Sequence, residues 1–158
     1  MQEISGDIWE LDCRYRVITT NGVVNSFGKA IMGKGIALKA KNLYLDYYPY
    51  INIDVILGKL IKAHGNHVYI IYDNLISFPT KHHWREKSDI ELIRRSAIEL
   101  VTLLGPKLNC NDIVLLPPPG CGNGGLKWDY VRPVIAPILD DHYYVVMYEN
   151  NVEKRLKI

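Results

Sequence analysis

Four short hydrophobic runs constrain the fold of this chain more than any other feature of its sequence. They cover residues 17–20, 68–72, 113–116 and 143–148, and they consist mainly of β-branched, aliphatic and aromatic residues. Hydrophobicity that is nearly continuous, rather than alternating, is typical of strands buried on both faces. The runs therefore predict a sheet covered by helices on both sides. Weaker strands are expected near residues 2–5 and 75–78.

The clearest helix is expected over residues 88–104. Ser88 and Glu91 form the S-x-x-E pattern of a capping box, and apolar residues then recur every three or four positions. Gly105-Pro106 is expected to end this helix, because proline cannot continue it and glycine accepts the left-handed conformation at a helix terminus. The pattern thus predicts one long amphipathic helix.

Two further helices are expected, one from about residue 34 to 49 and one over residues 129–139, which two prolines should keep short or kinked. Strands and helices alternate along the chain, and no repeat, low-complexity tract or linker interrupts them. This order predicts an α/β sandwich with a largely parallel sheet. A chain of 158 residues can bury a sizeable core, so we expect a single domain over residues 1–158.

The composition excludes several classes of protein. With 48% hydrophobic and 23% charged residues the chain is typical of soluble globular proteins, and its net charge of +2 is too small to indicate a nucleic-acid scaffold. Its three cysteines, Cys13, Cys110 and Cys121, have no disulfide or zinc-binding pattern. No secretory signal and no hydrophobic run of about 20 residues is visible. We therefore expect a cytoplasmic monomer that does not associate with membranes.

Two glycine-rich segments follow predicted strands and precede predicted helices. The first is Met32-Gly33-Lys34-Gly35-Ile36-Ala37, and the second is Gly120-Cys121-Gly122-Asn123-Gly124-Gly125. Open α/β sheets bind ligands at the carboxyl ends of their strands, and backbone N–H groups of such loops can form anion-binding nests. Neither segment has the spacing of a P-loop or of a dinucleotide-binding fingerprint. Two nests facing one crevice suit a pyrophosphate better than a single phosphate.

The order of the motifs resembles that of macro domains, a family that binds ADP-ribose. The motifs are Gly6-Asp7-Ile8 near the start, Thr20-Asn21 at a strand end, the segment 32–37, and the segment 116–126 with Trp128. The resemblance extends from Gly6 to Tyr148. It implies a three-layer α/β/α fold with a six-stranded mixed sheet, which agrees with the reading of the strands and helices.

Residues 78–84, together with Ser88, most resemble the bacterial antitoxin-type macro domains, which remove ADP-ribose from modified DNA and are related to the vertebrate terminal ADP-ribose glycohydrolase. The resemblance implies that Asp7 and Ile8 contact the adenine, Asn21 the distal ribose and the two glycine segments the diphosphate, while Tyr148 stacks on the adenine. The ligand-binding residues implied in this way are Asp7, Ile8, Asn21, Gly33, Lys34, Gly35, Ile36, Gly120, Cys121, Gly122, Asn123, Gly124 and Tyr148.

Lys81 and His83 match the catalytic lysine and histidine of the antitoxin type. A lysine at the anomeric carbon can attack that carbon or stabilise the charged transition state, and a histidine can move a proton to the leaving group. Two features depart from the family pattern. Gly124 stands where the vertebrate enzyme has an aspartate, and the segment between Asn21 and Met32 is longer than in the antitoxins.

The expected function is therefore that of an ADP-ribose-binding macro domain that hydrolyses an ADP-ribosyl bond. Its partner is ADP-ribose or an ADP-ribosylated macromolecule, with a DNA base or a protein side chain as the modified group. A non-catalytic ADP-ribose reader, an ADP-ribose 1″-phosphate phosphatase and a nucleic-acid-binding module remain open as alternatives. We expect no cofactor and no metal, because the histidine pairs of the chain have no supporting cysteine pair, and we expect Cys121 to be structural.

Overall fold

The computed structural model describes residues 1–148 and contains one mixed sheet of six strands, as the resemblance implies. The order across the sheet is β1-β6-β5-β2-β4-β3, and every neighbouring pair is parallel except β3 with β4. The strands are β1 (Gln2–Ser5), β2 (Tyr15–Asn21), β3 (Tyr69–Tyr72), β4 (Leu75–Lys81), β5 (Val114–Leu116) and β6 (Tyr143–Met147). All six predicted strands are therefore present, with boundaries shifted by a few residues.

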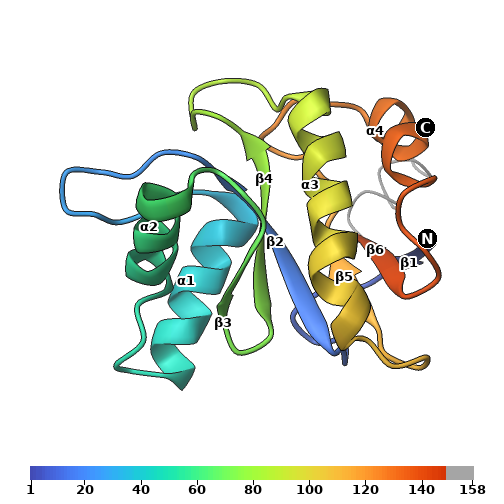
Figure 1. Cartoon of the computed structure of the whole chain (residues 1–158), viewed down its shortest axis with the longest axis horizontal. Helices are drawn as coiled ribbons and strands as arrows, with labels where there is room; N and C mark the ends of the chain where they lie inside the picture. Colours follow the sequence, from blue (N-terminus) through green and yellow to red (C-terminus); the bar gives the residue numbers. More distant parts are fainter. Residues whose placement is uncertain (149–158) are drawn as a thin grey trace.

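Helices cover both faces of this sheet (Figure 1). The helices α1 (Gly35–Tyr47) and α2 (Ile53–His64) lie on one side, and α3 (Ile90–Leu104) and α4 (Trp128–Ile135) lie on the other. Consecutive residues of β2 show why its sequence is continuously hydrophobic. Val17 packs in the cluster under α3 and α4, Ile18 packs in the cluster under α1 and α2, and both are 0% exposed. The three-layer α/β/α prediction is confirmed.

Helix α2 was not predicted from the sequence. Its buried face carries Ile53, Leu57 and Ile61, which have helical spacing, but Gly58 lies in the middle of the pattern. A Cβ atom at Gly58 would lie 2.1 Å from the carbonyl oxygen of Gly28, so glycine is required here for close contact with the 22–31 segment. The long segment after Asn21 is thus packed against α2.

The beginning and the end of α3 differ from the prediction. The helix is capped by Asp89 and not by Ser88, because the Asp89 carboxylate accepts hydrogen bonds from the N–H groups of Glu91 at 2.9 Å and Leu92 at 3.4 Å. At the other end Gly105 has φ −47° and continues into a 3-10 helix (Gly105–Lys107), so the predicted left-handed glycine is wrong.

No helix among residues 1–148 is long and apolar enough to cross a membrane.

Replacing Asp89 with alanine is expected to lower the free energy of unfolding by about 1 kcal/mol, which is typical for the loss of an N-cap. The hydrogen bond from His82 at 2.9 Å, together with the two N–H groups, lowers the pKa of Asp89 below its usual 3.8. The stabilisation from ionised Asp89 is therefore complete above that usual value and is lost as the pH falls through the lowered pKa. Urea denaturation at neutral and acidic pH measures both effects. A variant as stable as the wild type at neutral pH would contradict the assignment of the cap.

Candidate functional site

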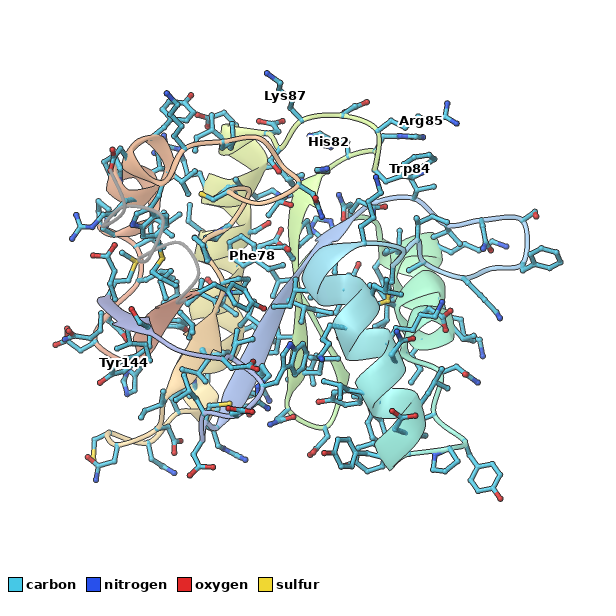
Figure 2. All side chains as sticks on the ribbon, turned by 180° about the vertical axis from the view of Figure 1, so that it is seen from behind. Phe78, His82, Trp84, Arg85, Lys87 and Tyr144 are labelled. Atoms are coloured by element: carbon cyan, nitrogen blue, oxygen red, sulfur yellow. The ribbon has the colours of Figure 1, made fainter. Side chains whose placement is uncertain are left out.

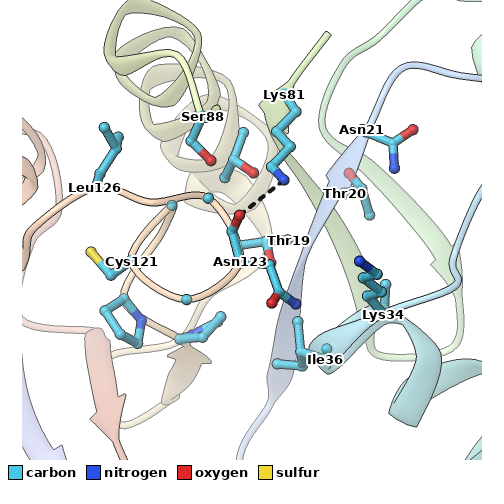
Figure 3. Close-up of a pocket in the computed structure, with 18 of the residues that line it drawn as sticks. Thr19, Thr20, Asn21, Lys34, Ile36, Lys81, Ser88, Cys121, Asn123 and Leu126 are labelled. Atoms are coloured by element: carbon cyan, nitrogen blue, oxygen red, sulfur yellow. Dashed lines mark hydrogen bonds between the residues drawn. The ribbon is translucent and has the colours of Figure 1, made fainter. Parts of the chain in front are cut away.

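A cavity of about 1320 Å³ lies along the carboxyl ends of the parallel strands (Figure 3). Its lining extends from Ser5 and Met147, at the ends of β1 and β6, to Asn21 and Lys81, at the ends of β2 and β4. Neighbouring strands are about 4.8 Å apart, so the four strand intervals from β1 to β4 correspond to roughly 19 Å. The cavity is thus long enough for an elongated ligand.

Thirteen of the fifteen residues predicted for the site line this one cavity. They are Asp7, Asn21, Gly33, Lys34, Gly35, Ile36, Lys81, Gly120, Cys121, Gly122, Asn123, Gly124 and Tyr148.

The first glycine segment forms the N-terminus of α1. Lys34 is the N-cap residue in an extended conformation, Gly35 has φ +59°, and no acidic residue lies in the first turn. The first N–H groups of a helix have no partner within the helix and attract anions. A Cβ atom at Gly35 would lie 3.1 Å from Nδ2 of Asn123 in the second glycine segment. The two segments therefore face one another closely, as the two-nest hypothesis requires.

The second glycine segment folds back on itself and is held in place by the backbone of Ser88. The N–H of Leu126 donates to the carbonyl of Gly120 at 2.9 Å, and the N–H of Ser88 donates to the carbonyl of Gly124 at 3.0 Å. A Cβ atom at Gly124 would lie 2.1 Å from Ser88 Oγ and 2.5 Å from the Gly120 carbonyl oxygen. Position 124 therefore has no room for the aspartate of the vertebrate enzyme.

A β-bulge places Lys81 beside Asn21. In the β2–β4 register Thr20 pairs with Pro79 but Asn21 pairs with Lys81, so Thr80 is an additional residue in β4. Bulges redirect side chains and are frequent next to active sites. The Lys81 ammonium lies 3.2 Å from the Asn123 carbonyl oxygen (Figure 3) and 3.5 Å from that of Trp84. Lys81 thus extends from the strand end to the second glycine segment.

The side-chain amide of Asn21 has a structural contact on each of its two polar atoms. Its Nδ2 donates to the carbonyl of Ile31 at 3.0 Å, and its Oδ1 accepts from the N–H of Val23 at 3.0 Å. Asn21 therefore closes the base of the 22–31 segment while it lines the cavity. One N–H of Nδ2 and one lone pair of Oδ1 remain for a ligand.

The charges around the cavity favour an anion. Four lysines line it, Lys34, Lys39, Lys81 and Lys127, against two aspartates, Asp7 and Asp129. The whole chain has a net charge of only +2, so the basic charge is concentrated at this crevice.

One end of the cavity carries an acidic and an aromatic side chain. The Asp7 carboxylate is exposed and accepts a hydrogen bond from the N–H of Trp9 at 2.9 Å. Tyr148 lines the same cavity as Asp7, and burial, followed by the negative charge of Asp7, raises the pKa of Tyr148. Tyr148 is 46% exposed. This end offers a hydrogen-bond acceptor and an aromatic ring.

Two predicted residues do not line the cavity. The Ile8 side chain is buried against Leu115 and Val146, so any part it takes is through its backbone. The His83 ring stacks on Trp84 with centroids 5.4 Å apart, and its Nδ1 accepts from the N–H of Arg85 at 3.1 Å. A proton-transfer role for His83 stays a prediction that requires its ring to leave this arrangement.

Cys121 has the chemistry of a packing residue. Burial raises the pKa of its thiol to about 11, which disfavours the nucleophilic thiolate. Its Sγ donates to the carbonyl of Pro119 at 3.5 Å.

Within residues 1–148 no group of three or more His, Cys, Asp or Glu side chains is arranged to hold a metal ion, and His67 instead pairs with Glu99 at 2.6 Å.

The structure adds lining residues that sequence reasoning missed. Trp9, Lys39, Trp84 and Ser88 are among them. Ser88 is 7% exposed and its Oγ has no hydrogen-bond partner among the described residues. The S-x-x-E pattern drew attention to Ser88 as a helix cap, and only the tertiary structure shows that it lies beneath the second glycine segment. The signal for Trp84 was its place in the 78–84 motif, three residues after Lys81.

Comparison with known proteins agrees with this geometry. No family model matches the chain. The macrodomain of Mycobacterium tuberculosis DarG superposes with a TM-score of 0.70 at 30% identity, covering 93% of this chain and 95% of that one. The macrodomain of Thermus aquaticus DarG gives 0.69 at 29% identity, covering 94% and 97%. A DNA ADP-ribosyl glycohydrolase of Mycobacterium tuberculosis is 33% identical over 136 residues, which are 81% of this chain and 35% of that protein.

An α/β/α sandwich with two facing glycine segments at its strand ends, and this degree of similarity, define the class: the chain belongs to the macrodomain family. Within that family it is of the antitoxin DarG type. The chain spans about a third of the length of the curated relatives that it matches.

Proposed function

We propose that the cavity binds ADP-ribose in an extended conformation. The adenine lies at the end with Asp7 and Tyr148, the diphosphate lies between the two glycine segments, and the distal ribose lies beside Asn21 and Lys81. The observation that carries this proposal is the single cavity lined by both glycine segments and by four lysines. A solved DarTG of Thermosipho africanus, with the same fold, is a complex with ADP-ribose.

We further propose that the protein hydrolyses the bond between C1″ of the distal ribose and a modified target. Water supplies the oxygen that bonds to C1″, the electron pair of the broken bond goes to the target, and the target gains a proton. Lys81 acts at C1″, either by attack of its amine or by stabilising the charge that develops on the leaving atom. The relatives carry the name DNA ADP-ribosyl glycohydrolase, which supports this reaction class.

For the target we propose a base of single-stranded DNA. Trp84 lines the cavity and is 41% exposed. The Lys81 ammonium donates a hydrogen bond to the backbone carbonyl oxygen of Trp84. Figure 2 shows Trp84, Arg85 and Lys87 projecting outward along one edge of the molecule. An aromatic ring can stack on a base, and the neighbouring cations can meet the backbone phosphates. The Arg85 guanidinium lies over one face of the Trp84 ring, 4.7 Å from the ring centre. A base that stacks on this face would displace the guanidinium.

The test is release of ADP-ribose from a single-stranded oligonucleotide that carries it on a base. The wild type is expected to release ADP-ribose, and Trp84→Ala is expected to raise KM about tenfold through loss of one stacking contact worth roughly 1–3 kcal/mol. Trp84→Phe should restore most of the affinity, and ADP-ribose binding should be unchanged in both variants. Release from an ADP-ribosylated peptide but not from the oligonucleotide would overturn the proposed target.

A non-catalytic reader of ADP-ribose is the second candidate. It is favoured by the position of His83 outside the cavity and by the contacts of the Lys81 ammonium, whose two hydrogen-bond partners among the described residues are backbone carbonyls. ADP-ribose binding without release from either substrate would select this function.

A further inference from the structure

The end of β4, which carries Lys81, extends beyond the strand beside it. The last residue of β4 that pairs with β3 is Ser77, which lies opposite Tyr69 at the start of β3. Residues 78–81 therefore have a strand neighbour on the β2 side only. Backbone carbonyls in such a position need partners from elsewhere when they are buried.

Three successive carbonyl oxygens at this end are each held by a group outside the strand. Ser96 Oγ, on α3, donates to the carbonyl of Pro79 at 2.7 Å, and the N–H of Asp89 donates to that of Thr80 at 2.9 Å. The side-chain Nδ2 of Asn66 donates to the carbonyl of Lys81 at 3.0 Å. These bonds fix the bulge that places Lys81 beside Asn21.

Asn66 also contacts the neighbouring strand end. A Cβ atom at Gly22 would lie 2.9 Å from both Cγ and Nδ2 of Asn66, so the amide is packed directly against the backbone that follows Asn21. One side chain thus contacts the chain immediately after Asn21 and the carbonyl of Lys81.

Asn66 is itself held by α3. The backbone carbonyl oxygen of Asn66 accepts a hydrogen bond from the Arg95 guanidinium, and this guanidinium forms an ion pair with the Glu99 carboxylate at 3.3 Å. Glu99 in turn accepts from the N–H of Val68 at 2.9 Å. The position of Asn66 is therefore fixed from its backbone as well as from its side chain.

We propose that Asn66 is a positioning residue for Lys81: its amide fixes the carbonyl of Lys81 and the strand end of Asn21 in one geometry, so that the amino group of Lys81 reaches the scissile bond at C1″ in the required position. This inference rests on the proposed hydrolase function. Asn66 does not line the cavity, so it acts on the reaction only through the backbone of its two neighbours.

The experiment compares Asn66→Ala and Asn66→Asp with the matched variant Asn74→Ala. Asn74 is a half-buried asparagine at the opposite end of β4, where its Oδ1 accepts from the Tyr44 hydroxyl at 3.0 Å. Asn66→Asp keeps the shape of the side chain and replaces the donor with an acceptor. For both Asn66 variants kcat for ADP-ribose release is expected to fall about 10- to 100-fold, since small misplacements at a reacting centre have effects of this size. The Kd for ADP-ribose should stay within about threefold, and Asn74→Ala should keep the wild-type kcat.

The proposal is overturned if Asn66→Ala or Asn66→Asp keeps the wild-type kcat, or if Asn66→Ala loses ADP-ribose affinity in step with kcat. A second readout needs no turnover. In 15N–1H spectra, Asn66→Ala is expected to shift the amides of Lys81 and His82, which flank the lost hydrogen bond, whereas Asn74→Ala should leave them in place. If the wild type releases no ADP-ribose, the proposed function fails, and unshifted amides in Asn66→Ala would reject the positioning role separately.

Discussion

Replacing Lys81 with alanine is expected to reduce the rate of ADP-ribose release by at least about 100-fold, while the Kd for ADP-ribose changes by less than about threefold. Removing one preorganised charge or donor at a reacting centre typically costs this much in kcat. Binding should survive because, in the proposed binding mode, the diphosphate contacts come from backbone groups of two loops that Lys81 does not build. The one contact between Lys81 and the second loop, at the Asn123 carbonyl, is a single hydrogen bond of 3.2 Å.

Lys39→Ala is the matched control for Lys81→Ala. It also removes one lysine from the lining of the cavity, but Lys39 lies on α1 and its side chain is exposed. It should weaken binding of an anionic ligand slightly and leave kcat unchanged. Single-turnover release and calorimetric binding, measured on the three proteins, separate the effects. If Lys81→Ala lost binding and turnover together, Lys81 would be a binding residue and the catalytic assignment would be wrong.

Gly124→Ala is expected to damage both folding and binding. The added methyl group would lie 2.1 Å from Ser88 Oγ and 2.5 Å from the Gly120 carbonyl oxygen, and the backbone oxygen cannot move without opening the loop. Overpacking of this kind costs about 1–3 kcal/mol of stability. Because we propose that the same loop forms one wall of the diphosphate site, we expect the Kd for ADP-ribose to rise by about tenfold or more, which corresponds to about 1.4 kcal/mol.

Gly122→Ala provides the comparison within the same loop. A Cβ atom at Gly122 would have no other atom within 4 Å, so this variant should fold with wild-type stability. Thermal unfolding and calorimetric titration of the two variants measure the difference. Equal stability and equal affinity in Gly124→Ala and wild type would contradict the loop geometry described above.

The sheet and its helical layers could be predicted because their residues carry local patterns. Strands buried on both faces have continuous hydrophobic sequences, and four of the five strand pairs are parallel, as such sequences indicate. Helix α2 escaped prediction because Gly58 interrupts its pattern, and the reason for that glycine is a contact with Gly28 far away in sequence. The cap of α3 was misassigned by one residue because Ser88 and Asp89 are both good capping residues.

The glycine segments of the site were visible in the sequence, and the structure brings them together at Gly35 and Asn123. The supports of the site were not visible. Neither the bulge at Thr80 nor the hydrogen bond from Asn66 to Lys81 has a local signal, because each depends on the register of two strands and on α3. The position of His83 likewise depends on its stacking against Trp84, which the order of residues does not specify.

Calorimetric titration with ADP-ribose, on the wild type and on Asp7→Ala, tests the central claim most directly. The wild type is expected to bind one ADP-ribose with a Kd on the order of micromolar, and Asp7→Ala is expected to weaken this by roughly tenfold through loss of one charged hydrogen bond. Asp7→Asn, which keeps an oxygen to accept from the N–H of Trp9, separates the loss of charge from a change in the turn. No heat of binding in a folded wild-type protein would contradict the account of the cavity, and equal affinity in Asp7→Ala would contradict the placement of the adenine.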